Sequence, residues 1–456
     1  MRSKSQKKNT QGGMLGAQVS TRPIETCASM HDAFLALPRA CGASTQAAAY
    51  QILYRAIVEE VPLVLSVSGI ASLSNQTRFW INSMIRAGYI AAISTTDALV
   101  YHDGHDALHP QPRHRKPGQP YQRAVRSVDP AGDDGLYRDN RVIRVYDVGF
   151  KEEILEEQDR VTRWLFAQPE FQHPMTTTER NFRMGKLYDA LEQARGIESG
   201  LVATAYQHAV PIFIGAPGDG SNSLGMLPLK MDSDLNGGSF GFQYDPLADV
   251  MEACAYHFWG LFTNPIKELG ILIMGGGVPK NFALQPEPSL LQNFMLDEGK
   301  HQVRGYKYDL QITSAPVSDG SLSSCPPSEA VSWGKVDRDT FRDTTTSIYG
   351  DYTQLFWPMA YSLFERRRLF ESEYTALPQP ERDKYLQHNP EARGLLRVQG
   401  GPRLFEQRKQ LTADFTKVAG SKKNMARIKD WFQDSPELFK TLDKLKKSGA
   451  LQAGDL

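Results

Sequence analysis

The chain has 456 residues and carries 52 basic and 52 acidic side chains, so its formal net charge is zero. This balance argues against a DNA partner held by overall charge. Hydrophobic residues make up 41% of the chain and charged residues 23%, as in ordinary globular proteins. No apolar run approaches the roughly 20 residues of a membrane-spanning helix, so we expect no membrane partner.

The first 44 residues form a predicted polar N-terminal extension. Their start is basic, but no apolar segment follows, so it does not resemble a secretory signal. The chain's cysteines form no CxxC pair and no disulfide framework, which fits a reducing compartment; they are Cys27, Cys41, Cys254 and Cys325. We therefore expect a cytoplasmic protein.

Short apolar runs alternate with amphipathic stretches over residues 45–368. The alternation predicts an α/β domain with a Rossmann-like parallel sheet flanked by helices. The expected strands are 63–67, 90–94, 211–215, 269–274, 309–313 and 346–349, and the clearest helices are 46–60, 77–87 and 248–262.

Residues 104–135 interrupt this alternation with Pro, Gly, His and Arg, which predicts a loop or insertion. Its basic side chains either meet phosphates or an acidic partner, or are simply solvated; they are Arg113, Arg115, Lys116, Arg123 and Arg126. Near its start, His102, His105 and His109 recur at helical spacing beside Asp103 and Asp106. Such a set suits zinc or iron, but histidine-rich loop edges also occur without metal, and we expect none.

Residues 369–456 are charged and predicted to form a helical C-terminal extension. Ser435, Pro436 and Glu437 are typical of a helix start. The Lys- and Leu-rich helix that follows either packs as an accessory helix, meets a neighbouring subunit or binds anionic RNA.

Three glycines, Gly275, Gly276 and Gly277, directly follow the expected strand 269–274. Glycine lets a ligand approach the backbone, where free amides can hold a pyrophosphate. The GxGxxG spacing is absent, so a plain strand-to-helix turn is the alternative.

A second segment, Ser328-Glu-Ala-Val-Ser-Trp-Gly-Lys335, ends in a lysine. A lysine forms a Schiff base only as the neutral amine, which burial beside an aromatic ring favours. Trp333 and Lys335 would share one face of an extended segment, and Glu329 could hold a cationic amine. An ordinary lysine at the end of an element is the alternative.

A third segment, Ala216-Pro-Gly-Asp-Gly-Ser221, follows the expected strand 211–215. Its Asp219 is placed for a cofactor ribose or a cationic substrate, or the segment is only a turn.

Together, GGGVPKN (275–281), SEAVSWGK (328–335) and APGDGS (216–221) resemble the deoxyhypusine synthase family, most closely its bacterial branch of uncertain acceptor. The resemblance implies a Rossmann-like homotetramer with active sites between paired subunits. It also implies NAD as cofactor and spermidine, or another polyamine, as donor of an aminobutyl group. That group passes through an enzyme-lysine imine to a protein lysine, giving deoxyhypusine, or to a diamine such as putrescine, giving homospermidine.

The resemblance also implies the site residues. Lys335 would be the catalytic, imine-forming lysine. The polyamine would contact Trp333, Glu329, Asn281 and His102. The cofactor would contact Gly275, Gly276, Gly277, Asp219, Thr96, Ser314 and Ala315.

Some positions depart from the family's pattern. Asp97 stands where the branch has a small residue, and near NAD phosphates it would repel the cofactor by its charge, or else bind ribose hydroxyls. Met226 and Leu322 replace acidic polyamine ligands of the eukaryotic enzymes, and the Asp219 loop is longer than usual. Asp97 and the longer loop motivate one alternative, a catalytically silent paralogue acting as a binding or regulatory subunit. Another alternative is a different NAD-linked oxidoreductase that uses Lys335 only as a cation.

Overall fold

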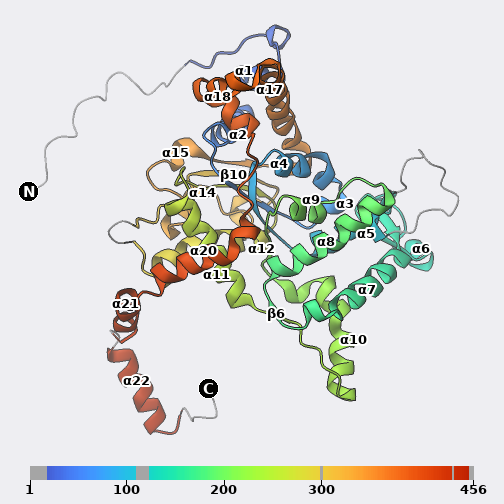
Figure 1. Ribbon diagram of the computed structural model, residues 1–456, viewed down its shortest axis with the longest axis vertical. Helices are drawn as coiled ribbons and strands as arrows, with labels where there is room; N and C mark the ends of the chain where they lie inside the picture. Colours follow the sequence, from blue (N-terminus) through green and yellow to red (C-terminus); the bar gives the residue numbers. More distant parts are fainter. Residues whose placement is uncertain (1–17, 109–122, 298–300, 434–435, 451–456) are drawn as a thin grey trace, which may run out of the picture.

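The computed structural model describes residues 18–108, 123–297, 301–433 and 436–450. At its centre is a six-stranded sheet in the order β11-β10-β9-β1-β2-β7, with every neighbouring pair parallel (Figure 1). The strands are β1 (Leu63–Val67), β2 (Ile90–Thr95), β7 (Ile212–Ile214), β9 (Gly270–Met274), β10 (Tyr308–Thr313) and β11 (Thr345–Tyr349). This confirms the predicted Rossmann-like sheet, with each predicted strand end within one residue of the observed one.

The strand order reverses beside β1. The chain runs outward from β1 through β2 to β7, and then returns to place β9, β10 and β11 on the other side. In open parallel sheets, ligands bind in the crevice beyond the carboxyl ends of the strands at such a reversal. Here that place lies between the ends of β1 and β9.

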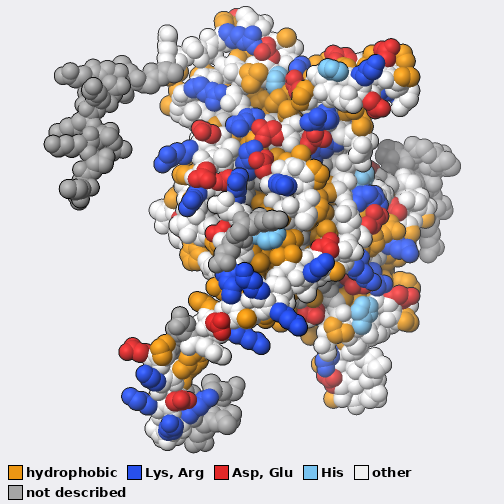
Figure 2. Space-filling model, turned by 60° about the vertical axis from the view of Figure 1, so that its left-hand side comes forward, with side chains coloured by type: hydrophobic (Ala, Val, Ile, Leu, Met, Phe, Trp, Pro, Cys, Tyr) orange, Lys and Arg blue, Asp and Glu red, His pale blue; other side chains and the backbone are white. Residues whose placement is uncertain are grey.

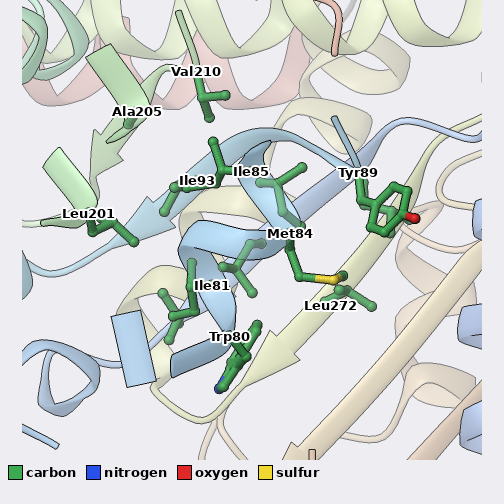
Figure 3. Packing of buried hydrophobic residues seen from close by; sticks show 14 of the residues in the cluster. Trp80, Ile81, Met84, Ile85, Tyr89, Ile93, Leu201, Ala205, Val210 and Leu272 are labelled. Atoms are coloured by element: carbon green, nitrogen blue, oxygen red, sulfur yellow. The ribbon is translucent and has the colours of Figure 1, made fainter. Parts of the chain in front are cut away.

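The sheet is buried on both faces, because side chains that alternate along one strand enter different cores. Leu63 and Leu65 of β1 face one core, whereas Val64 faces the other. Figure 3 shows side chains of the first core, among them Trp80, Ile81 and Met84, gathered over the sheet. The first face is covered by α2 (Cys41–Val58), α4 (Asn82–Arg86), α9 (Leu201–Gln207) and α17 (Trp357–Ala376), and the second by α11 (Pro246–Phe258), α12 (Gly277–Leu284) and α20 (Leu404–Ala419).

Two predicted helices each contain a π-helical turn, η2 (Thr77–Ile81) before α4 and η5 (Trp259–Thr263) after α11.

The predicted insertion at 104–135 is wrong at its start, because α5 (Asp97–Leu108) continues to Leu108. Its far end enters a small antiparallel sheet of β3 (Arg126–Ser127), β5 (Val148–Lys151) and β4 (Val142–Val145), with α6 (Asp134–Asp139) packed on β4. Residues 109–122, with His109, Arg113, Arg115 and Lys116, lie outside the described residues.

Both predicted extensions contain packed helices. In the N-terminal segment, α1 (Met30–Ala36) stacks Phe34 on Tyr50 with ring centroids 4.4 Å apart. In the C-terminal segment, α20 buries Leu404 and Phe415 in the second core.

The last two helices differ from α20. In Figure 2 the arm formed by α21 (Lys422–Gln433) and α22 (Pro436–Lys447) extends from the body, with apolar and basic side chains on its surface. Among all the helices of the described ranges, none is long and apolar enough to cross a membrane.

Candidate functional site

The glycine turn lies at the strand-order reversal. Gly275 and Gly276 follow β9 with φ angles of 67° and 80°, in the left-handed region that favours glycine. A Cβ atom on Gly276 would stand 3.4 Å from Ser68 Cα, so the turn packs closely on the end of β1. Gly277 begins α12, whose free amides at this end favour an anion. The turn therefore has the shape and the charge preference of a site for a nucleotide's phosphates.

The ends of β1 and β2 complete this edge. A Cβ atom on Gly69 would stand 2.6 Å from Thr96 Oγ1, so the two turns pack closely. Ser314 and Ala315 follow β10, and Ser314 is exposed. Asp219 ends the short helix η4 (Pro217–Asp219) beyond β7 and is also exposed. Four strand ends thus place the predicted cofactor residues along one edge of the sheet.

Asp97 does not face the crevice. Its carboxylate is 0% exposed, and its Oδ1 lies 2.6 Å from Arg180 Nη2, also 0% exposed. Asn222 donates to both carboxylate oxygens, from its backbone N–H and from Nδ2, each at 3.1 Å. The charge is balanced inside the fold, so neither predicted role of Asp97, repulsion of phosphates or binding of ribose hydroxyls, is correct.

Lys335 and Trp333 lie side by side, with Lys335 Nζ 5.5 Å from the Trp333 ring centroid. The predicted reason, an extended segment, is wrong: η8 (Val331–Trp333) ends at Gly334, whose φ of 72° turns the chain. Lys335 is consequently 8% exposed, whereas Trp333 is 57% exposed. Burial lowers the pKa of the Lys335 amine, although Cys325 and Glu287 act in the opposite direction, and a lower pKa favours the neutral, nucleophilic form.

A second buried lysine, Lys280, lies nearby and was not among the predicted site residues. Its Nζ donates to Gln311 Oε1 at 2.6 Å and to the Cys325 carbonyl at 2.5 Å. Burial lowers its pKa, and the charge of Lys335 lowers it further. Its position within GGGVPKN was the signal that could have drawn attention to it.

Two buried acids, Asp309 and Glu287, affect the pKa values of these lysines. Asp309 on β10 is buried, which raises its pKa to about 7 against the opposing effect of Lys280. Glu287 on α13 (Pro286–Pro288) is 0% exposed, and its Oε1 lies 3.2 Å from Nε2 of His257 on α11. Glu329 on α14 (Pro327–Ala330) is exposed instead. Sequence reasoning missed Asp309, Glu287 and His257, because no local pattern shows which acids become buried.

A cavity of about 460 Å³ opens beside α12. Gly277, Asn281 and Leu322 are among its lining residues, together with apolar side chains of α11 and α12. A mostly apolar cavity with few polar groups suits the carbon chain of a small ligand. Met226 does not line it and is buried on α10 (Ser221–Asn236).

His102 lies apart from this cavity. Its Nδ1 is 2.8 Å from His105 Nε2, and burial lowers its pKa to about 4. Asp103 accepts from the Val202 N–H, and Asp106 pairs with Arg123 at 2.8 Å. Within the described part of the chain, no group of three or more histidine, cysteine, aspartate or glutamate side chains could hold a metal ion.

Comparison with known proteins identifies the family. The family model described as deoxyhypusine synthase matches residues 36–363. The chain belongs to the deoxyhypusine synthase family. The parallel, Rossmann-like sheet agrees with this membership.

Curated relatives carry similar names. A "Deoxyhypusine synthase-like protein" of Thermosynechococcus vestitus is 34% identical, covering 66% of this chain and 69% of the relative. A protein of the same name from Nostoc punctiforme is 31% identical over 74% of this chain and 80% of its own length. A "Probable deoxyhypusine synthase 2" of Methanosarcina mazei is 28% identical over 68% of this chain and 79% of the relative. Among solved structures, a putative deoxyhypusine synthase from Entamoeba histolytica matches with TM-score 0.43 and 12% identity, over 76% of this chain and 97% of that one.

Proposed function

We propose that this protein transfers an aminobutyl group from spermidine to an acceptor amine, with NAD as cofactor and Lys335 as the residue that carries the group. The observation that most supports the proposal is the buried amine of Lys335 beside Trp333. A desolvated lysine is neutral over more of the pH range and adds readily to an electrophilic carbon.

The residues around the crevice fit NAD. The left-handed Gly275 and Gly276 leave room for a ligand, and the α12 amides at Gly277 suit a pyrophosphate. When bound, NAD would take a hydride from the carbon beside the secondary amine of spermidine and return it at the end, so no net oxidation occurs.

Lys335 would act on that carbon. Its neutral amine forms a new C–N bond as the bond to diaminopropane breaks, and the proton released by Lys335 leaves with the diaminopropane nitrogen. The acceptor amine then displaces Lys335 in the same way, which restores the free lysine. Trp333 would shield the butyl chain from water, and Asn281 and Glu329 would meet its amines.

The acceptor is proposed to be a protein lysine or a diamine such as putrescine. Leu322 in the cavity wall presents no charge where eukaryotic members hold an acid, which favours an altered acceptor. The silent-paralogue alternative loses one of its supports, because the Asp97 charge is balanced by Arg180.

Reductive trapping tests the proposal. The protein is incubated with NAD and spermidine, treated with borohydride and mapped by mass spectrometry. We expect an aminobutyl adduct on Lys335 that is absent from Lys335→Met. Lys280→Met, which removes the other buried lysine, serves as the matched control and should keep the adduct on Lys335. An adduct on Lys280, or none on the wild-type protein, would contradict the proposal.

A further inference from the structure

A second cavity, of about 520 Å³, lies at the edge of the sheet opposite the glycine turn. Its lining residues Glu60 and Pro62 lie just before β1, and Asn264 and Ile266 lie shortly before β9. All six strands run parallel, so these residues mark the amino ends of the strands. The glycine turn is at the carboxyl end of β9, so the cavity is separate from the proposed NAD site.

The other wall of this cavity comes from the C-terminal extension. The match to the family model ends at residue 363, and the lining residues beyond it are Leu386, Arg393 and the loop 397–402. Arg397 fixes the loop to the domain, because its guanidinium donates to the carbonyls of Gly88 at 2.8 Å and Val61 at 3.1 Å. The cavity is therefore not a feature of the family domain alone.

Two arginines and one acid line the cavity, which leaves an excess of positive charge. Nε of Arg393 lies 2.6 Å from Oε2 of Glu60, the one carboxylate among the described lining residues. Arg397 forms no ion pair within the described ranges and donates to backbone carbonyls instead. Burial lowers the pKa of Arg397 to about 10, which still leaves it charged at neutral pH. A ligand with one negative charge would therefore balance the wall.

Two side chains of the wall also hold hydrogen-bond donors that no described residue accepts. Asn264 is 5% exposed, and its Oδ1 accepts from the Ile266 N–H at 3.0 Å. Only the oxygen of the amide can accept, so Nδ2 is left to donate. Arg393 uses Nε for Glu60 and keeps both Nη groups. A buried donor is costly when it is unpaired, and the oxygens of an anion would satisfy it.

The rest of the lining is largely apolar. The apolar lining residues are Pro62, Trp259, Pro265, Ile266, Leu386, Val398 and Pro402. An apolar lining with a few polar groups is typical of small-molecule sites, whose volumes are roughly 300–1,000 Å³. Trp259 adds an aromatic ring against which a flat or apolar group can pack.

We propose that this cavity binds a small molecule that joins an apolar or aromatic body to one anionic group, either a carboxylate or a phosphate. Arg393 and Asn264 would bind the anionic group, and Trp259 would pack against the body. Arg397 would add its charge. The inference goes beyond the proposed function, because none of these residues belongs to the proposed aminobutyl-transfer site.

Isothermal titration calorimetry of the full chain tests the class of ligand. Phenyl phosphate and benzoate each join a ring to one of the two anionic groups, whereas inorganic phosphate lacks the ring and benzyl alcohol lacks the charge. We expect phenyl phosphate or benzoate to bind about 10-fold more tightly than both simpler probes, and the tighter of the two identifies the anionic group. If neither ring-bearing anion exceeded both simpler probes, the proposal would be overturned.

Two matched arginine variants test the place of binding. Arg393→Gln removes a cation of the wall whose side chain is 48% exposed, and should weaken probe binding about 10-fold. Arg403→Gln is the control, because Arg403 is 47% exposed but pairs with Glu406 and does not line the cavity. The control should bind the probe as the wild type does. An equal loss in both variants, or a loss in neither, would count against the cavity.

Hydrogen exchange of the wild type locates the probe without any variant. The bound probe should slow amide exchange in residues 264–266 and 397–402 and leave residues 275–277 unchanged. Slower exchange confined to 275–277 would assign the probe to the glycine turn and overturn the proposal. Neither measurement depends on the adduct at Lys335, so failure of this inference and failure of the proposed function are distinguishable.

Discussion

The molecule holds two buried acids whose surroundings are built in opposite ways. Arg180 and Asp97 are both 0% exposed, lie 2.6 Å apart and are completed by hydrogen bonds from Asn222. Glu287 is also 0% exposed, but among the described residues it has no comparable set of donors, and the nitrogen beside it is Nε2 of His257 at 3.2 Å. A guanidinium stays charged in proteins, whereas burial lowers the pKa of His257 to about 4 and raises that of Glu287. Asp97 and Arg180 therefore form a fixed ion pair, whereas Glu287 and His257 can both exist without charge.

Removing the arginine should have the largest effect on stability. Arg180→Met leaves Asp97 buried and unpaired, which should cost roughly 3–5 kcal/mol of unfolding free energy in chemical denaturation. Arg183→Met on the same helix, α8 (Thr177–Arg195), is the control. It breaks a partly exposed pair with Glu179 and should cost about 0.5 kcal/mol.

The pH dependence of stability should show that Glu287 is protonated in the folded protein. Its pKa is raised on folding, so above the unfolded pKa the native state holds a proton that the unfolded chain has released. Stability then falls as pH rises, by up to about 1.4 kcal/mol per pH unit, until the folded pKa is reached. Glu287→Gln lacks this titrating group, so its free energy of unfolding should rise relative to that of the wild type as the pH goes from 5 to 8. A constant difference across that range would show that Glu287 is ionised in both states.

Removing the lysine should cost far less than removing the arginine. Lys335→Met keeps the side-chain volume, and a protonated Glu287 leaves no unpaired charge behind. The expected loss is below about 1.5 kcal/mol, measured by the same denaturation. A loss as large as that of Arg180→Met would mean that removing Lys335 leaves an ionised acid without compensation, and the contrast between the two acids would disappear.

The contrast also shows what the sequence could predict. Apolar runs bounded by turn residues predicted all six strands of the central sheet, because a parallel sheet buried on both faces leaves a continuous apolar signal. The glycine motif correctly predicted a turn after β9, whereas the extended segment expected at Lys335 is a helical turn. The environments of Asp97 and Glu287 could not be read in this way. Arg180 lies 83 residues from Asp97 along the chain, and burial of Glu287 depends on α11 and the segment around Tyr306.

The smallest expected effect comes from the hydrogen bonds around Asp97. Removing one of them tests whether the charge of Arg180 is what holds the Asp97 carboxylate in place. Asn222→Ala removes the Nδ2 donor but keeps Arg180 and the backbone N–H of residue 222 on the carboxylate. Because two of three donors remain, we expect a loss of about 1 kcal/mol in unfolding free energy. Asn236→Ala, near the exposed end of the same helix, should change almost nothing. If Asn222→Ala cost as much as Arg180→Met, the hydrogen bonds rather than the arginine charge would hold Asp97 in place.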